Sequence, residues 1–221
     1  SEPGNIIIPN TDLKAEYANN FEINFLTKKN NIEFNTSIYY TKLNSAIIRS
    51  DGTFNGLDSI MYDESLSKIQ TLINSGKAYV FGFSYRINYK INNDFKLKSS
   101  LSFNQSKDFT TNQPLRHSSP IFGQTMISYS KRNIKINYYL DYNGKKDISD
   151  FSPSELNKLY LYTIDGSPAW VTNNISFNYN INYLAKINFS CENIFDIHYR
   201  TYSSGISSPG RNFNIGLNMS F

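Results

Sequence analysis

The sequence predicts an all-β fold, an antiparallel transmembrane β-barrel, to which these 221 residues contribute about nine strands. Two observations carry this prediction. Apolar and polar residues alternate with a period of two in segment after segment, which is the pattern of strands whose two faces meet different surroundings. The connections between these segments are alternately short and long, as in a transmembrane barrel whose two rims differ.

Composition is compatible with this fold and excludes several others. The mean hydropathy is −0.46, yet the chain contains 17 Tyr and 16 Phe. No stretch approaches the roughly 18 apolar residues of a transmembrane helix, so a membrane crossing must rest on strands. The net charge of +4 is modest and its cations are scattered, which argues against nucleic-acid binding. The single Cys191 excludes an internal disulfide framework and a zinc module.

The expected strands follow one another along the whole chain. The clearest lies at 79–92, and the last, at 212–221, alternates up to its final residue. In chain order, the strand positions on the apolar side are Leu13, Ala15, Tyr17, Phe21, Ile23 and Phe25; Ile32, Phe34, Thr36, Ile38 and Tyr40; Phe81, Phe83, Tyr85, Ile87, Tyr89 and Ile91; Phe95, Leu97, Leu101 and Phe103; Ile127 and Tyr129; Ile134, Ile136, Tyr138, Leu140 and Tyr142; Val171, Ile175, Phe177, Tyr179 and Ile181; Ala185, Ile187 and Phe189; and Phe213, Ile215, Leu217, Met219 and Phe221.

The connections are sorted by length. Successive connections of an antiparallel meander lie at opposite ends, so all short turns fall on one rim and all long loops on the other. A water-soluble sheet with one buried face explains any single strand equally well, but it gives no reason for this sorting. Short polar turns are expected at 28–31, 92–94, 131–133 and around 182, and long irregular stretches at about 51–68, 108–120, 145–167 and 197–211.

The expected strand number is odd, whereas single-chain bacterial barrels have even numbers. With short turns in the periplasm, the first strand would begin outside, although a secreted precursor delivers its N-terminus to the periplasmic side. No leader is visible at Ser1, which is expected of a processed chain or a piece of a longer one. Nine strands alone would leave two open edges, which lipid does not tolerate. We therefore expect residues 1–221 to be the C-terminal part of a larger barrel.

Several short motifs resemble those of TonB-dependent outer-membrane receptors. In that family a strand ends in Asn-Leu-Phe-Asp, a Pro-Gly-Arg-like turn re-enters the last strand, and the chain closes on an aromatic residue. Here Ile194 replaces the Leu. The matching residues of this signature are Asn193, Phe195, Asp196, Pro209, Gly210, Arg211 and Phe221.

Two further motifs extend the resemblance toward the start of the chain. The run Pro9-Asn10-Thr11-Asp12-Leu13-Lys14-Ala15-Glu16 is similar to the family's Asn-Pro-Asp-Leu-Lys-Pro-Glu segment, with Ala15 in place of the second Pro. The run Asn74-Ser75-Gly76-Lys77-Ala78, followed by Gly82, is similar to the family's Asn-x-Gly-x-Ala-x-x-x-Gly strand. The order and spacing of the motifs over the whole chain make the match specific.

The resemblance implies a 22-stranded barrel with an N-terminal plug, of which this chain holds the last nine or so strands and neither the plug nor the N-terminal strands. Such a receptor lies in the outer membrane of Gram-negative bacteria. It binds a scarce nutrient, such as a ferric siderophore, haem, cobalamin or a glycan, and imports it when the TonB complex pulls on the plug. Its partners would be this small ligand, outer-membrane lipid, and the barrel-assembly machinery, which recognises the C-terminal strand with Phe221. The abundance of Asn, Lys and Ile favours a Bacteroidetes-type source.

Two other functions remain open at this stage. A passive porin-like barrel would lack the plug, and a membrane-embedded enzyme would need a polar triad on neighbouring strands. No Ser/His/Asp or Cys/His arrangement is legible, so no catalytic residue, cofactor or resident metal is expected. Cys191 is expected to act as a small hydrophobe.

The candidate ligand-binding residues lie in the long loops or close to them, near the expected extracellular rim: Arg116, His117, Tyr160, Tyr162, Trp170 and Tyr202. His117 could be an axial haem ligand or a solvated loop residue, and His198 is read in the same way. The aromatic residues could form a membrane-interface girdle or a stacking surface for a sugar or chelate.

Charged residues offer two more readings. Asp147, Asp150 and Glu155 could bind calcium, although their spacing favours simple solvation. The cations in phase with the polar side could attract an anionic substrate or contact the plug. They are Arg86, Lys90, Lys96, Lys98, Lys135 and Lys186.

Overall fold

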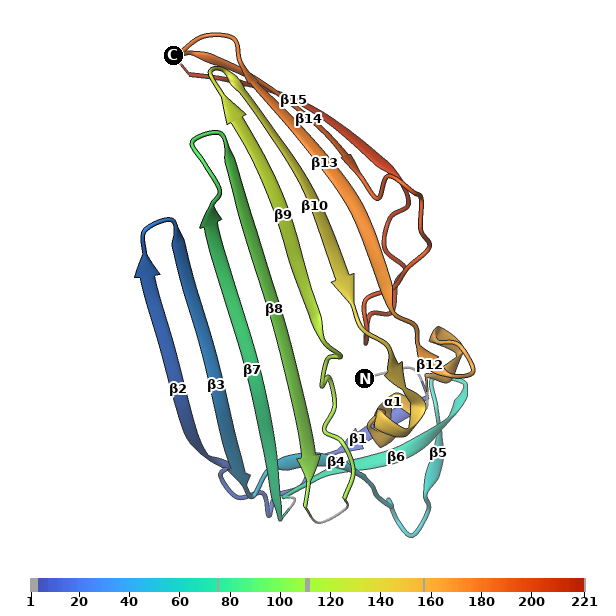
Figure 1. Cartoon of the computed structure of the whole chain (residues 1–221). Coiled ribbons are helices and arrows are strands. Elements are labelled where there is room, and N and C mark those ends of the chain that lie inside the picture. The colour runs from blue at the N-terminus through green and yellow to red at the C-terminus, as the bar shows by residue number, and fades with distance from the viewer. Residues whose placement is uncertain (1–3, 75, 110–111, 157, 221) are drawn as a thin grey trace. The chain divides into compact units, whose positions relative to one another are not determined.

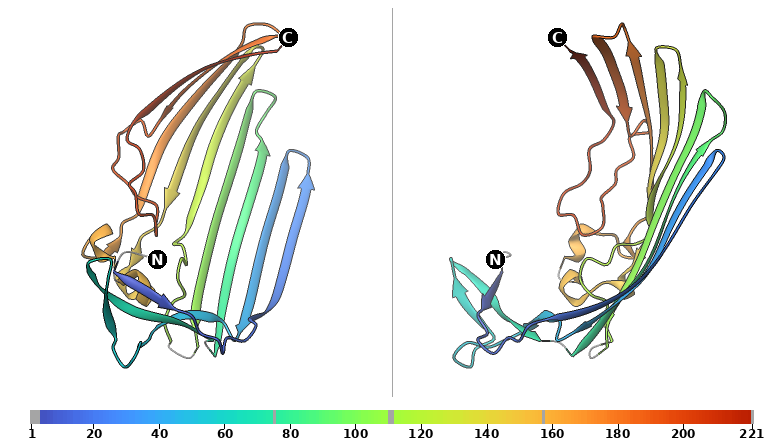
Figure 2. Two further views of the ribbon diagram at one scale, coloured as in Figure 1. Left: turned by 180° about the vertical axis from the view of Figure 1, so that it is seen from behind. Right: turned by 90° about the vertical axis from the view of Figure 1, so that its left-hand side faces the viewer.

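The computed structural model describes residues 4–74, 76–109, 112–156 and 158–220. Its main element is a nine-stranded sheet in the order β2-β3-β7-β8-β9-β10-β13-β14-β15, so the predicted number of strands in this sheet is confirmed (Figure 1). Consecutive members of this series lie side by side in both views of Figure 2. The bounds are β2 (Tyr17–Lys29), β3 (Ile32–Asn44), β7 (Lys77–Lys90), β8 (Phe95–Asp108), β9 (Phe122–Lys131), β10 (Ile134–Asn143), β13 (Trp170–Asn180), β14 (Ala185–Glu192) and β15 (Asn212–Met219).

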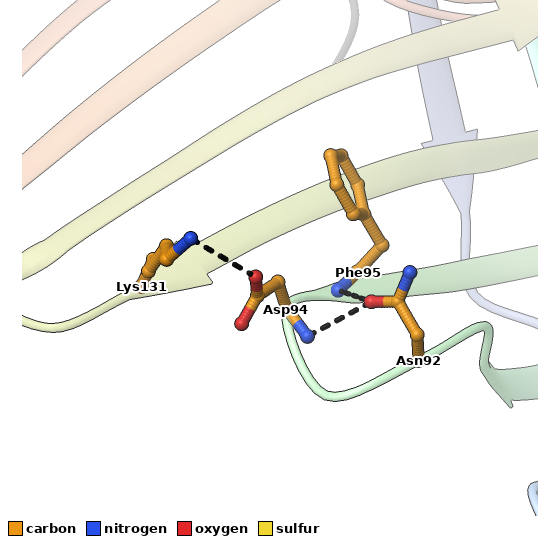
Figure 3. A network of polar contacts seen from close by, with 4 residues as sticks. All are labelled: Asn92, Asp94, Phe95 and Lys131. Carbon is orange, nitrogen blue, oxygen red and sulfur yellow. Dashed lines mark hydrogen bonds and ion pairs between the residues drawn. The ribbon is translucent and has the colours of Figure 1, made fainter.

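The predicted sorting of connections is confirmed. Short turns join β2 to β3, β7 to β8, β9 to β10 and β13 to β14, and the other connections are long. Side chains fix two of these turns: the Asn92 Oδ1 atom accepts hydrogen bonds from the Asp94 and Phe95 N–H groups at 2.9 and 2.8 Å (Figure 3). Asn182 holds the β13–β14 turn through two equivalent bonds of 2.8 Å. Asn is suited to this because its side chain mimics a backbone turn.

The strand register places apolar residues beside apolar residues on one face of the sheet and polar residues beside polar residues on the other. Phe177, Phe189 and Ile215 are neighbours across β13, β14 and β15, and one residue further on Asn178, Asn188 and Gly216 are neighbours. We call these two sides the apolar face and the polar face. Many large side chains of the apolar face are exposed, including Ile187, Phe189 and Ile215, which suits a surface that meets lipid. Cys191 lies on this face between Ile175 and Phe213 and is buried, as expected of a small hydrophobe.

The chain divides into two compact units. One contains a small sheet formed by β1 (Asn5–Ile8), β4 (Ile47–Asp51), β5 (Ser59–Tyr62) and β6 (Ser65–Asn74). β6 is its centre, since it pairs in parallel with β1 and antiparallel with β4 and β5. The core of this unit includes Ala46, Ile69 and Ala78. No helix among the residues that the structure describes is long and apolar enough to cross a membrane.

Two expectations about this unit are wrong. Residues 51–68 are not irregular throughout, because β5 and the start of β6 lie there. The hydropathy pattern does not reveal strand β6, because a polar residue, Ser67, is buried while the apolar Leu66 beside it is 68% exposed. The first strand of the large sheet begins at Tyr17 rather than Leu13. The residues before it bind β6 instead, with the Lys14 N–H donating to the Asn74 Oδ1 atom at 2.7 Å.

Replacing Gly123 by Ala is expected to destabilise the sheet by about 1–3 kcal/mol, the usual cost of overpacking. A Cβ atom at Gly123 would lie 2.3 Å from the Ser100 carbonyl oxygen and 2.6 Å from the Tyr142 hydroxyl. The Ser100 carbonyl is backbone in the middle of β8, and it already accepts a hydrogen bond from the Tyr142 hydroxyl at 3.2 Å. Thermal unfolding in detergent measures the effect.

Gly216→Ala is the matched control, because a Cβ atom there would meet only Asn188 Nδ2, at an ordinary 3.6 Å. A Gly123→Ala protein as stable as the Gly216→Ala protein would show that the contact across Gly123 is not restrictive.

Candidate functional site

Three long loops of the second unit meet in one place, which we call the loop cluster and define by Lys146, Phe151, Glu155, Tyr162 and Tyr202. Four of these residues lie in the β10–β13 connection, and Tyr202 lies in the β14–β15 connection. The β10–β13 connection contains β11 (Lys146–Asp147), η1 (Ile148–Asp150), α1 (Pro153–Leu156), η2 (Leu159–Leu161) and β12 (Gly166–Ser167). The third loop, between β8 and β9, contributes His117 and Ser118.

Glu155 joins these loops through its carboxylate, which is buried in a residue only 4% exposed. Oε2 accepts hydrogen bonds from the Ser152 N–H and hydroxyl at 3.2 and 3.1 Å, and from the Tyr202 hydroxyl. Oε1 accepts from the His117 N–H at 3.2 Å. The expectation that Glu155 is solvated is therefore wrong. A buried carboxylate needs such partners, because burial without them is costly.

A cation and three aromatic rings complete the loop cluster. The Lys146 ammonium lies 4.6 Å from the centre of the Tyr202 ring and donates to the Ser118 carbonyl. The Phe151 ring packs edge-on against Tyr162 and Tyr202, with centroids 4.8 and 5.4 Å apart. Burial lowers the pKa of Lys146, although nearby Glu155 opposes the shift. Burial and the bond to Glu155 raise the pKa of Tyr202, and burial raises that of Tyr162.

His117 is exposed, but it is held in place. Its Nδ1 atom lies 2.6 Å from the Ser203 hydroxyl, and the Ser203 N–H donates to the Tyr162 hydroxyl at 3.1 Å. Both His117 and Ser203 have left-handed backbone conformations, with φ of 61° and 65°, which residues with a Cβ atom adopt rarely. The pair does not form a hydrolase triad, because Glu155 meets His117 only through its backbone N–H.

The structure thus brings together three of the six candidate ligand residues: His117, Tyr162 and Tyr202. Tyr160 is 81% exposed and Arg116 is also exposed. Trp170, at the start of β13, packs against Tyr199 with ring centroids 4.4 Å apart and the ring planes tilted by 43°. His198 is exposed, and Asp147 pairs with Lys145 at 2.6 Å. No group of three or more potential metal ligands occurs in the described ranges.

Asn193, Asp196 and Arg211 of the C-terminal signature hold the β14–β15 loop. The Asn193 N–H donates to Asn174 Oδ1 at 2.8 Å, and its side chain exchanges two bonds with the backbone of Ile197. Asp196 Oδ1 accepts from the Arg211 N–H at 2.7 Å. A Cβ atom at Gly210 would lie 2.5 Å from that Asp196 oxygen. Phe195 is 66% exposed, Pro209 offers its carbonyl to Asn193, and Phe221 lies outside the described residues.

The central place of Glu155 in the loop cluster was not predicted, although the sequence contains a signal for it. Ser152-Pro153-Ser154-Glu155 is a capping-box pattern, in which the Ser begins a helix and the Glu three residues later bonds back to its N–H. Such a pattern predicts α1 and the Ser152 contacts. It does not predict Tyr202 or His117, which come from loops far away in the sequence.

Glu155→Ala is expected to loosen all three loops, because the Tyr202 hydroxyl and the His117 and Ser152 N–H groups lose their acceptor. A buried donor left unpaired costs about 1–3 kcal/mol. Amide hydrogen exchange of residues 112–120, 146–162 and 197–211 measures this opening, and Asp147→Ala is the control because Asp147 is exposed. Equal exchange in the two variants would contradict a central role for Glu155.

Alkaline pH is expected to weaken the loop cluster through its tyrosines. Since the pKa values of Tyr162 and Tyr202 are raised above 10.0 in the folded protein, the stability that they contribute is complete below that pH and is lost above it. Lys146 acts in the opposite sense, because its lowered pKa makes its burial less costly as the pH approaches 10.5. Tyr202→Phe should therefore flatten the loss of stability between about pH 9 and 11, measured by thermal unfolding. Parallel pH profiles of variant and parent would refute this assignment.

Comparisons with known proteins agree with this architecture. The family model for TonB dependent receptor-like β-barrels matches residues 1–194. No curated protein matched the chain in sequence.

Solved structures share the fold at low identity. The copper transporter OprC has a TM-score of 0.76 and 14% identity, over 96% of this chain and 32% of its own. The siderophore receptor PirA from Acinetobacter baumannii has a TM-score of 0.73 and 18% identity, over 97% and 33%. The FrpB iron transporter from Neisseria meningitidis (F5-1 variant) has a TM-score of 0.72 and 17% identity, over 99% and 34%. The chain therefore spans about a third of the length of these proteins, and it belongs to the TonB-dependent receptor-like β-barrel family of the Gram-negative outer membrane.

Proposed function

We propose that the protein containing this chain imports a scarce nutrient across the outer membrane with energy supplied through TonB. The observation that carries the proposal is the family match over residues 1–194, on a sheet with one apolar and one polar face. The transporters and receptor of similar fold are described as handling copper, iron and siderophores. A metal or its chelate is therefore the nutrient we favour among the siderophore, haem, cobalamin and glycan classes.

We also propose that residues 1–221 are the C-terminal part of a larger barrel, preceded by a plug and further strands. Support comes from the chain spanning about a third of its structural relatives. The edge strands agree: β2 is exposed along almost its whole length and so is β15. Unpaired strand edges are unfavourable in lipid, so partner strands on both sides fit the membrane best. TonB would act through the plug, and the barrel-assembly machinery through the C-terminal strand.

Within the loops, we assign different roles to the six candidate residues. Tyr202 is buried and Tyr162 is half-buried, and both are held by contacts of the loop cluster, so they position the loops. Arg116, His117 and Tyr160 are exposed, so they are suited to touch a ligand. Trp170 packs on Tyr199 at the strand end, where an aromatic residue of a membrane girdle would lie.

Deleting the gene is expected to abolish energised uptake of a ferric chelate, tested with a panel of radiolabelled ferric siderophores in iron-starved cells. Uptake should return with the gene on a plasmid and should stop when a protonophore removes the inner-membrane energy that TonB transmits. Uptake that survives the protonophore would contradict energised import and point to a passive barrel. A purified full-length protein that conducts ions steadily in planar bilayers would do the same.

A further inference from the structure

The polar face carries a dense group of cations that neither the fold nor the loop cluster uses. We call it the basic wall: Lys28 on β2, Arg86 and Lys90 on β7, and Lys96 and Lys98 on β8. Four of them line a cavity of about 340 Å³, and Arg86 lines a second of about 370 Å³ together with Lys98. All five residues are exposed.

Two of these cations are neighbours across the β7–β8 hairpin. The Ile91 N–H donates to the Phe95 carbonyl at 3.0 Å, so these two residues face each other. One residue further along each antiparallel strand, Lys90 therefore faces Lys96. Both side chains line the same cavity. Like charges opposite each other on antiparallel strands are destabilising, so this arrangement is unfavourable unless an anion lies between them.

The described part of this chain supplies little compensating charge. Glu33 is the one carboxylate that lines either cavity, and in the described part of the chain no ion pair joins a basic-wall cation to a carboxylate. Asp94, in the turn that joins β7 to β8, is paired instead with Lys131 at 3.9 Å (Figure 3). The positive charge of the basic wall is thus largely uncompensated within the described part of this chain.

We propose that the basic wall binds a small polyanion, a molecule that carries two or more phosphate or carboxylate groups. The cavity volumes fall in the range of small-molecule sites. Lysine is a common phosphate ligand and arginine suits phosphate or carboxylate. Asn88, Ser100 and Gln124 line the second cavity and add neutral hydrogen-bonding groups.

The position of the basic wall indicates where along a transport path the anion would bind. Lys28, Lys90 and Lys96 lie next to the short turns, and short turns face the periplasm in outer-membrane barrels. An anionic nutrient would meet the wall late in its passage. This step, which names the nutrient as anionic, rests on the proposed function, whereas the binding of a polyanion does not.

The test is an isothermal calorimetric titration of the purified full-length protein, in detergent, with inorganic pyrophosphate. Lys90→Gln with Lys96→Gln should weaken binding about tenfold or more, since two charge-assisted contacts are lost. Lys135→Gln with Lys186→Gln is the matched control. These two lysines also lie on the polar face but are flanked by neutral Ser130 and Asn178, and by Asn180 and Asn218. Heat-dependent migration on gels confirms that both double variants are folded.

Two results together support the proposal. The parent and the control variant bind pyrophosphate saturably, and binding weakens as NaCl rises from about 50 to about 300 mM because the charges are screened. Equal weakening by the two double variants overturns it. Absence of saturable binding in the parent also overturns it, as expected if an acidic stretch of the polypeptide already covers the wall. Energised uptake is measured separately. A protein that binds pyrophosphate but imports nothing would refute the proposed function and leave the proposed anion site standing.

Discussion

The backbone of a strand that crosses lipid must find all its hydrogen bonds within the sheet, because hydrocarbon supplies none. This constraint explains the arrangement of the large sheet. Each strand between β8 and β15 pairs antiparallel with the next, and the side chains are left free to differ on the two faces. The apolar side chains then have no core to enter, so residues such as Ile215 remain exposed. Among the described residues, buried side chains gather in the small sheet around Ile69 and in the loop cluster around Glu155. The large sheet adds mainly polar ones, such as Thr172 and Asn174 on β13.

The same constraint decides which features were predictable. A period of two survives in the sequence wherever one face is apolar and the other polar, so the strands of the large sheet were readable, including the weak segment around Ile127. It fails where a strand packs within protein. In β6 a buried Ser67 follows an exposed Leu66, and no hydropathy pattern reveals that strand. Strand β2 was placed correctly apart from its start, because Lys14 bonds to the Asn74 side chain instead of joining the ladder.

The loop cluster was less predictable for a different reason. Its contacts join residues far apart in the chain, such as Glu155 with His117 and Tyr202, and a sequence motif can announce only local partners. The capping box at Ser152 was such a local signal. Tyr160, Tyr162 and Tyr202 were predicted together because they are of one residue type, although their surroundings differ. Tyr162 and Tyr202 form a ring contact inside the cluster, while Tyr160 is exposed.

Polar contacts also connect the second cavity beside the basic wall to the C-terminal signature. Gln124, which lines the second cavity, donates to Asp141 Oδ1 at 2.7 Å, and Asn174 Nδ2 donates to the other Asp141 oxygen at 3.0 Å. Asn174 Oδ1 then accepts from the Asn193 N–H at 2.8 Å. The Gln124 and Asn174 side-chain amides each donate a hydrogen bond to the Asp141 carboxylate. The position of Gln124 at the cavity therefore depends on strands β10 and β13 being in register. The signature residue Asn193 closes the series, so a motif that resembles the family's C-terminal signature also anchors one end of the polar face on which the proposed anion site lies.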